Sequence, residues 1–242
     1  MKSLTDEAIV TGGMDYRDAD RIVHLYTRDH GRISGIARGA KKSVKRFGGA
    51  FELFARVTVN FLPAENLSSL KSAEPITIYQ GIRKELDKIS FASYAVELLA
   101  ALTPERLPNK RVFRLLVAYL EHLDSFAADP SDRHFFEINL LNILGYRPPL
   151  ESCPSCGADL MVSGGRWSES ERHLLCIFCT KKGEMISPSG VSRLITSMNT
   201  GRFGQVRFSD DDIGGIDRFM ESFILANTGR ALKSLAFLRL SP

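Results

Sequence analysis

Residues 21–37 read RIVHLYTRDHGRISGIA, two short runs of β-branched and apolar residues on either side of Asp29-His30-Gly31. Runs of this length and composition are typical of β-strands. Gly31 can adopt the positive φ angle that a tight connection requires, so the two runs are predicted to form a β-hairpin. The prediction of the fold starts from this hairpin.

Three further strands are predicted around the hairpin. Residues 8–11 form one before it, and residues 51–62 form a longer one after it, with alternate residues from Phe51 to Phe61 on one face and Pro63 at its end. Residues 70–79 form a weaker fifth strand. No helical segment between these strands could serve as a crossover, so five short strands within about eighty residues predict a small closed barrel.

Positive charge is concentrated in one segment of the chain. The sequence holds 32 Lys and Arg against 28 Asp and Glu, but the segment from His30 to Phe51 contains no carboxylate and six cations: Arg32, Arg38, Lys41, Lys42, Lys45 and Arg46. Without this segment the chain is slightly acidic. Attraction to a polyanion should therefore be focused on these cations, most of which lie in a predicted flexible loop between the third and fourth strands. The alternative is a charged loop that only keeps the protein in solution.

Four aromatic residues lie near this loop: Tyr26, Phe47, Phe51 and Phe54. Aromatic rings on a strand face can stack on nucleic-acid bases. Small barrels also fill their interiors with such side chains, and for each ring this second interpretation is the expected one.

The remainder of the chain has helical periodicity with one interruption. Helices are predicted at residues 82–102, 110–126, 132–144 and 188–198, with Ser131 as the N-cap of the third and one or two more helices within residues 209–235. The predicted architecture is α+β and has four parts: a barrel at residues 1–80, a helical part at 81–150, an insert at 151–182 and a second helical part at 183–242.

The insert contains the only four cysteines, in two Cys-x-x-Cys pairs formed by Cys153, Cys156, Cys176 and Cys179. Two such turns can complete a tetrahedron of sulfurs around zinc, and four thiolates leave no open position, so a structural zinc ribbon is predicted. Disulfides are the alternative, but the acidic start of the chain does not resemble an export signal, and a cytoplasmic, reducing location is expected. A redox motif would come as a single pair. His173 is expected to be an exposed polar residue and not a fifth ligand.

No catalytic motif is evident. The sequence has neither a Gly-x-Ser-x-Gly nor a phosphate-binding Gly-x-x-x-x-Gly-Lys-Ser/Thr pattern. A binding protein that is not an enzyme is therefore expected. Two other binding functions stay open: an RNA-binding barrel, and a sequence-specific regulator that reads duplex DNA through its zinc ribbon.

Three stretches in this order resemble the RecO family of bacterial recombination mediators. They are Arg38-Gly39-Ala40-Lys41-Lys42 with Arg46-Phe47, the helix end from Phe136 to Tyr146 that leads to Cys153, and Gly229-Arg230-Ala231-Leu232-Lys233-Ser234. The resemblance covers nearly the whole chain. It implies an oligonucleotide-binding (OB) fold at the N-terminus and a nucleoid-associated protein that works in DNA repair and recombination.

The resemblance also implies activities and partners. The family binds single- and double-stranded DNA, anneals complementary strands, and helps the RecA recombinase to load in gap repair. Its partners are the ring-forming mediator RecR and the acidic C-terminal tail of single-stranded DNA-binding protein. Residues that dock the tail should combine an apolar pocket with cations, for which Arg230 and Lys233 are candidates. A helix-end cation that only interacts with the helix dipole is the alternative for both.

Overall fold

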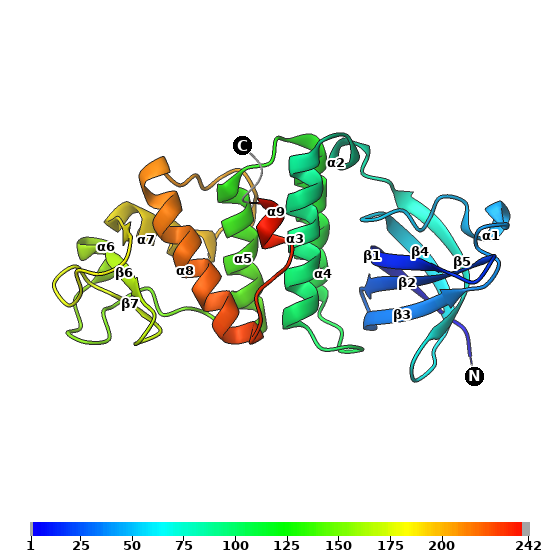
Figure 1. The fold of residues 1–242 in the computed structure, drawn as a ribbon, viewed down its shortest axis with the longest axis horizontal. Coiled ribbons are helices and arrows are strands. Elements are labelled where there is room, and N and C mark those ends of the chain that lie inside the picture. Colours follow the sequence, from blue (N-terminus) through cyan, green and yellow to red (C-terminus); the bar gives the residue numbers. More distant parts are fainter. Residues whose placement is uncertain (1, 239–242) are drawn as a thin grey trace. The chain divides into compact units, whose positions relative to one another are not determined.

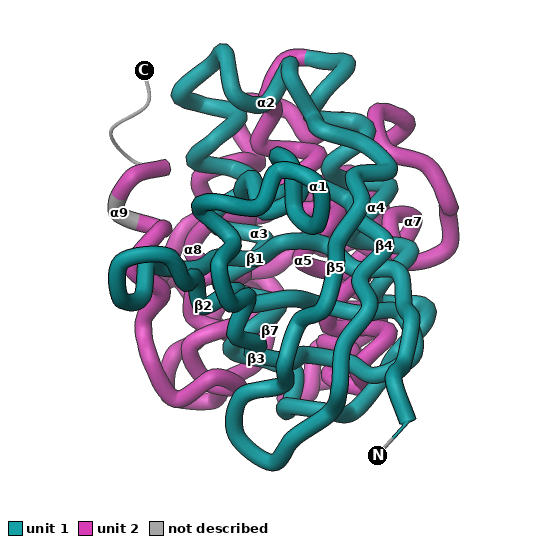
Figure 2. Tube along the Cα trace, turned by 90° about the vertical axis from the view of Figure 1, so that its right-hand side faces the viewer, with its two compact units in different colours: residues 1–126 teal, residues 127–242 magenta. Residues whose placement is uncertain are grey.

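The computed structural model describes residues 2–238, which form two compact units that divide after Phe126 (Figure 2). Barrel and first helices belong to the first unit. The second unit holds the remaining helices and the four cysteines. No helix within residues 2–238 is long and apolar enough to cross a membrane.

The first unit contains a closed five-stranded barrel (Figure 1). Its strands follow one another in space as β1-β2-β3-β5-β4, and β3 and β5 form the parallel pair that closes it. This is the order of an OB-fold barrel, so the predicted fold class is confirmed. The strands are β1 (Leu4–Tyr16), β2 (Asp20–Thr27), β3 (Gly31–Ala37), β4 (Arg56–Leu62) and β5 (Ser68–Thr77).

The β2–β3 hairpin has the tight turn that the sequence predicts. Gly31 adopts a φ angle of 69°, and the hydroxyl of Thr27 donates to the Gly31 carbonyl at 2.9 Å. The buried carboxylate of Asp6 accepts from the backbone N–H of Asp29 at 2.9 Å and lies 2.7 Å from Nδ1 of His30. The turn is therefore held by a contact within the hairpin, from Thr27 to Gly31, and by Asp6 of the neighbouring strand β1.

Two strands differ from the prediction. β1 is longer because Gly12 and Gly13 continue the strand through a β-bulge instead of ending it. β4 begins at Arg56 and not at residue 51. The chain turns at Phe54, whose φ angle is 69°, and Leu53 remains 45% exposed. Phe51 packs into the end of the barrel, so the backbone has to turn before it can enter the sheet.

Three helices follow the barrel in the first unit: α2 (Gln80–Lys84), α3 (Leu86–Leu102) and α4 (Lys110–Ser125). The single helix predicted for residues 82–102 is wrong, because the chain is extended at Glu85. The side chain of Asp124 accepts from the backbone N–H groups of Gly81 and Ile82, at 2.5 and 3.2 Å. This contact with the end of α4 fixes α2 as a separate helix.

The second unit combines helices with a small three-stranded sheet, in the order β7-β6-β8. Trp167 in this sheet packs against Phe219 of α8, with ring centroids 5.4 Å apart. Gly215 allows the backbone of Met185 to lie directly on α8, where a Cβ atom would come within 2.6 Å of the Met185 carbonyl oxygen. The sheet thus packs on α8. The division of the chain into a barrel, two helical parts and an insert between them stays a prediction. The elements are α5 (Pro130–Leu144), α6 (Leu160–Ser163), β6 (Gly165–Ser168), β7 (His173–Leu175), β8 (Met185–Ile186), α7 (Pro188–Ser197), α8 (Asp210–Thr228) and α9 (Leu235–Leu238).

One helix cap also differs from the prediction. Asp129, and not Ser131, is the N-cap of α5: its side chain accepts from the Ser131 N–H at 2.7 Å, and Pro130 is the first helical residue. The Asp-Pro pair thus begins this helix, because proline fits the first turn, where its missing N–H is not needed. Ser187 is the N-cap of α7, and its side chain accepts from the N–H of Gly190 at 3.0 Å.

A charge cluster joins α5 to α8. His134, which is buried, lies 2.7 Å from a carboxylate oxygen of Glu137 and 3.0 Å from one of Asp217. Burial raises the pKa of Asp217, but contacts with His134 and Arg133 outweigh it and leave that pKa below its usual value. Because the folded pKa is lowered, this carboxylate contributes stability above its unfolded pKa, and the contribution is lost as the pH falls.

We expect Gly31→Ala to lower the free energy of unfolding of the barrel by about 3 kcal/mol. A Cβ atom there would lie 2.5 Å from the Leu107 carbonyl oxygen, in addition to the cost of a left-handed alanine. Gly49→Ala is the control, because Gly49 has a similar φ angle of 72° and no atom within 4 Å; it should cost only about 1 kcal/mol. Hydrogen exchange of the barrel strands measures both, and equal losses would contradict the close approach.

Candidate nucleic-acid interface and metal site

The basic segment, residues 38–55 between β3 and β4, is anchored at several points. The Gly39 N–H donates to Asp20 at 2.8 Å, and the Lys41 N–H donates to the Ala19 carbonyl at 3.1 Å. Phe47 and Phe51 lie 5.2 Å apart and belong to the core of the barrel. The segment also forms a short helix, α1 (Val44–Phe47), so it is more ordered than the predicted loop.

The predicted DNA-binding side chains of this segment point away from that core. The exposed cations are Arg38, Lys41, Lys42, Lys45 and Arg46. Arg46 donates to Ser43 at 3.0 Å and to the Arg38 carbonyl at 2.9 Å, and its guanidinium lies 5.1 Å from the Phe47 ring centroid. The segment therefore carries its charges in a defined arrangement.

Among the described residues, one of the three lysine ammonium groups in this segment is paired with an acid. Lys41 lies 2.9 Å from Asp15, and its hydrogen bond lowers the pKa of that carboxyl. Within residues 2–238, Lys42 and Lys45 form no ion pair with a carboxylate. These two ammonium groups are open to an external anion.

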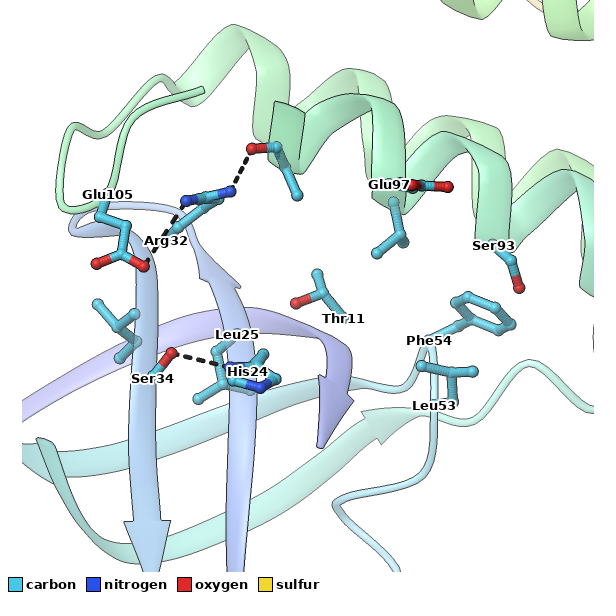
Figure 3. A pocket seen from close by; sticks show the side chains of 13 residues that line it. Thr11, His24, Leu25, Arg32, Ser34, Leu53, Phe54, Ser93, Glu97 and Glu105 are labelled. Carbon is cyan, nitrogen blue, oxygen red and sulfur yellow. Dashed lines mark hydrogen bonds and ion pairs between the residues drawn. The ribbon is translucent and has the colours of Figure 1, made fainter. Parts of the chain in front are cut away.

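Arg32 lies on β3 and not in the basic segment, and it faces α3 (Figure 3). Its guanidinium donates to the Ala100 carbonyl and is 3.7 Å from Glu105. It lines a pocket of about 380 Å³ between the barrel and α3, and its side chain is 25% exposed. In this position Arg32 links the hairpin to the helices; a contact with DNA stays a prediction.

The four aromatic residues considered for base stacking are all buried. Tyr26, Phe47, Phe51 and Phe54 are each 5% exposed or less. Tyr26 stacks on Phe113 of α4, with ring centroids 6.3 Å apart. The expected interior position is confirmed for Phe47 and Phe51, whereas Tyr26 is buried against α4 and Phe54 lines the pocket beside α3.

The candidate partner residues follow α8. Gly229 ends that helix in the left-handed conformation, and Arg230 and Lys233 lie exposed in the turn after it. The Arg230 carbonyl accepts from Thr228 at 2.8 Å. Their role in partner binding stays a prediction.

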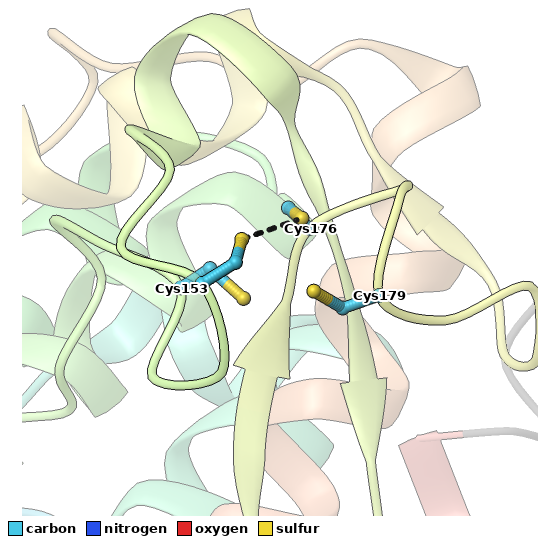
Figure 4. Close-up of side chains that lie close together, drawn as sticks. Cys153, Cys176 and Cys179 are labelled. Carbon is cyan, nitrogen blue, oxygen red and sulfur yellow. Dashed lines mark hydrogen bonds between the residues drawn. The ribbon is translucent and has the colours of Figure 1, made fainter.

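The four cysteines meet at one point (Figure 4). Their sulfur atoms all lie within 4.8 Å of one another, and those of Cys156 and Cys176 are 3.6 Å apart. A metal–sulfur distance of about 2.3 Å implies sulfurs about 3.8 Å apart in a tetrahedron. The cluster thus fits a four-sulfur metal site. His173 is outside the cluster, as expected, but it is half-buried and not exposed.

Backbone hydrogen bonds position the four cysteines of this cluster. Both pairs lie in tight turns, closed by hydrogen bonds from the Gly157 N–H to Cys153 at 2.8 Å and from the Cys179 N–H to Cys176 at 3.1 Å. Burial opposes ionisation of Cys153, but backbone N–H groups that point at its sulfur lower the pKa of this thiol to about 6. Hydrogen bonds with the sulfurs of Cys156 and Cys176 raise the pKa of Cys179 to about 12. A divalent cation would allow all four sulfurs to carry charge together.

Two cations near the basic segment were not predicted from the sequence. Arg21 and Arg83 line a pocket beneath the segment, together with Lys41. Arg21 lies on the side of β2 that also carries the buried Val23 and Leu25. The sequence offered a signal for Arg21 alone, since an arginine on the inward side of a strand is unusual. Arg83 gave no such signal, because α2 brings it to the pocket by tertiary structure.

The fold and these sites define an OB-barrel protein with an exposed basic segment and a four-cysteine ribbon that can bind metal. Family models for the N-terminal and C-terminal parts of recombination protein O match residues 1–79 and 83–236. The chain therefore belongs to the RecO family of DNA repair proteins.

Individual relatives agree with this assignment. The chain is 46% identical to a DNA repair protein RecO from Geobacter sulfurreducens, over 99% of this chain and 98% of the relative. It is 45% identical to the protein of that name from Geobacter metallireducens, with the same coverage, and 33% identical to that from Symbiobacterium thermophilum, over 96% of this chain and 95% of the relative.

We expect the chain to bind one metal ion, and Cys153→Ser to lose it. Trp167 is the only tryptophan and lies in the ribbon, so its fluorescence reports the order of this part. A strong chelator should shift its emission to the red as the ribbon opens. Ser155→Ala, between two of the cysteines and exposed, is the control and should keep the metal. Unchanged emission in chelator would show that metal does not hold the ribbon.

Proposed function

We propose that this protein is a DNA-binding recombination mediator that anneals complementary single strands. In this proposal it also helps to load the RecA recombinase onto strands covered by single-stranded DNA-binding protein, in recombinational gap repair. The observation that carries the proposal is the basic segment, because it exposes Lys42 and Lys45 on the surface of an OB barrel, where neither forms an ion pair with a carboxylate of residues 2–238. Membership of a family of DNA repair proteins also supports a function in DNA binding and repair.

The proposed mechanism is electrostatic and includes no chemical step. Two DNA strands repel each other through their phosphates. Cations of the basic segment would neutralise phosphates on both strands and so lower this repulsion while bases pair. The proposed contacts are Arg38, Lys41, Lys42, Lys45 and Arg46, with Arg32 as a weaker candidate because it is already bound to Ala100 and Glu105.

The metal in this proposal is zinc, and its role is structural. Four cysteine thiolates are the donor set that zinc prefers in closed tetrahedral sites. With every position occupied by sulfur, the ion would hold the ribbon against α8 and leave no position for water or substrate. Metal analysis of the purified protein tests its identity.

The proposed partners are single- and double-stranded DNA, RecR and the acidic tail of single-stranded DNA-binding protein, with Arg230 and Lys233 as candidates for contact with the tail. An RNA-binding barrel and a zinc-ribbon regulator are the rivals. Competition between DNA and RNA strands of the same sequence tests the RNA-binding barrel, which should prefer the RNA strand. Base-dependent affinity that survives loss of the basic segment would favour the second.

Changing Lys41, Lys42, Lys45 and Arg46 together to Ala should weaken the dependence of DNA affinity on salt. With four to six phosphates contacted on a single strand, the logarithmic slope should be roughly −3 to −4 for the native protein, and each lost contact should remove about 0.7. Titrations of fluorescent oligonucleotides at several salt concentrations measure the slope.

The matched control removes four exposed cations elsewhere, Arg111, Arg114, Lys181 and Lys182. It should leave the slope nearly unchanged. An equal effect of both variants would mean that total charge, and not the basic segment, attracts DNA. A larger effect of the control would mean that cations outside the basic segment are the main contacts with DNA.

Mediator function is tested by annealing of strands coated with single-stranded DNA-binding protein. We expect annealing of coated strands by the native protein, and loss of it when the coating protein lacks its acidic tail. Annealing of bare strands should persist in both cases. Activity on coated strands that does not depend on the tail would contradict the proposed partner.

A further inference from the structure

Beneath the basic segment, at one end of the barrel, lies a polar pocket of about 400 Å³. It is formed by residues from β2, the basic segment and α2, so three parts of the first unit meet there. Its lining includes three cations and one carboxylate: Arg21, Lys41, Arg83 and Glu52. Leu53 lies at its edge and also lines the neighbouring pocket beside α3.

Arg21 carries an unsatisfied donor at this pocket. It lies on the inward side of β2, where the barrel interior reaches its end. Its Nε atom is buried and has no hydrogen-bond partner among the described residues. A buried N–H group without an acceptor is unfavourable, so Arg21 would gain an interaction if its side chain turned this group toward an anion in the pocket.

The other two cations are held by carboxylates that a stronger anion could replace. Lys41 pairs with Asp15 at 2.9 Å, and Arg83 forms an ion pair with Glu52. Both pairs are accessible to water, since the side chains of Asp15 and Arg83 are 65% and 46% exposed. Exposed ion pairs of this kind contribute little stability and exchange readily.

We propose that Arg21, Lys41 and Arg83 bind one backbone phosphate of a DNA strand, and that Asp15 and Glu52 release their cations when the strand binds. The inference rests on the proposed function, because it places a phosphate of the same DNA beneath the same segment. Guanidinium groups can bind phosphate through paired hydrogen bonds. Lys42, Lys45 and Arg46 continue the positive surface beyond the pocket, so a strand is favoured over a single small anion.

This arrangement makes the two carboxylates competitors of the DNA. Their removal should therefore strengthen binding of a single strand, whereas removal of the arginines should weaken it. We expect Arg21→Gln and Arg83→Gln each to weaken binding about 3- to 10-fold near 0.1 M salt, with a slope smaller by about 0.7. Asp15→Asn and Glu52→Gln should each strengthen it about 3-fold.

Matched controls separate the pocket from general charge. Arg114→Gln removes an exposed cation of α4, and Glu74→Gln removes an exposed carboxylate of β5; neither residue lines the pocket. Both should change affinity by less than about 1.5-fold. If Arg21→Gln does not fold, as judged by circular dichroism, the Arg83, Asp15 and Glu52 variants still decide the question.

The outcomes distinguish the pocket from the proposed function. If the native protein binds DNA without salt dependence, the proposed function itself fails. If native binding is salt-dependent but the pocket variants behave like their controls, only the pocket is overturned. A third arm adds sodium phosphate in place of sodium chloride at equal ionic strength. Stabilisation of the native protein by phosphate, absent in Arg83→Gln, together with unchanged DNA affinity of that variant, would assign the pocket to a free anion and overturn the DNA site.

Discussion

The packing of Phe47 and Phe51 into the end of the barrel is the interaction on which the rest of the first unit depends. These rings close the barrel interior and at the same time fix the backbone of the basic segment. The cations that precede Phe47 in the segment are exposed, because the rings occupy the inward positions. A segment that would otherwise spread apart through charge repulsion is held in place by apolar burial.

Carboxylates around the segment complete this arrangement. Asp20 binds the backbone of Gly39, whereas Asp15 and Glu52 bind the side chains of Lys41 and Arg83. The first contact orders the segment and need not change when DNA binds. Asp15 and Glu52 pair with cations that could otherwise bind a DNA phosphate. The ion pairs that balance charge in the folded protein would therefore also limit its affinity for DNA.

Sequence reasoning predicted those features that depend on local chemistry. Gly31 at the turn, the alternating strands and the paired cysteines each require particular residues at particular spacings, and the structure contains the hairpin, the barrel and the cysteine cluster. Sequence reasoning failed where tertiary contacts determine the bounds of an element or bring distant residues together. The strand predicted from residue 51 starts only at Arg56 because Phe51 packs into the core, and the break in the predicted helix at Glu85 accompanies a contact of α2 with Asp124. Arg83 joins Arg21 and Lys41 only because α2 returns to the barrel, which no local pattern reveals.

The most direct test of the central claim is hydrogen exchange of the full-length protein with and without a single-stranded oligonucleotide, read by mass spectrometry. Residues 38–55 should exchange more slowly when DNA is bound, while residues 151–182 of the ribbon should be unchanged. Protection confined to the ribbon, with the basic segment unaffected, would contradict the account.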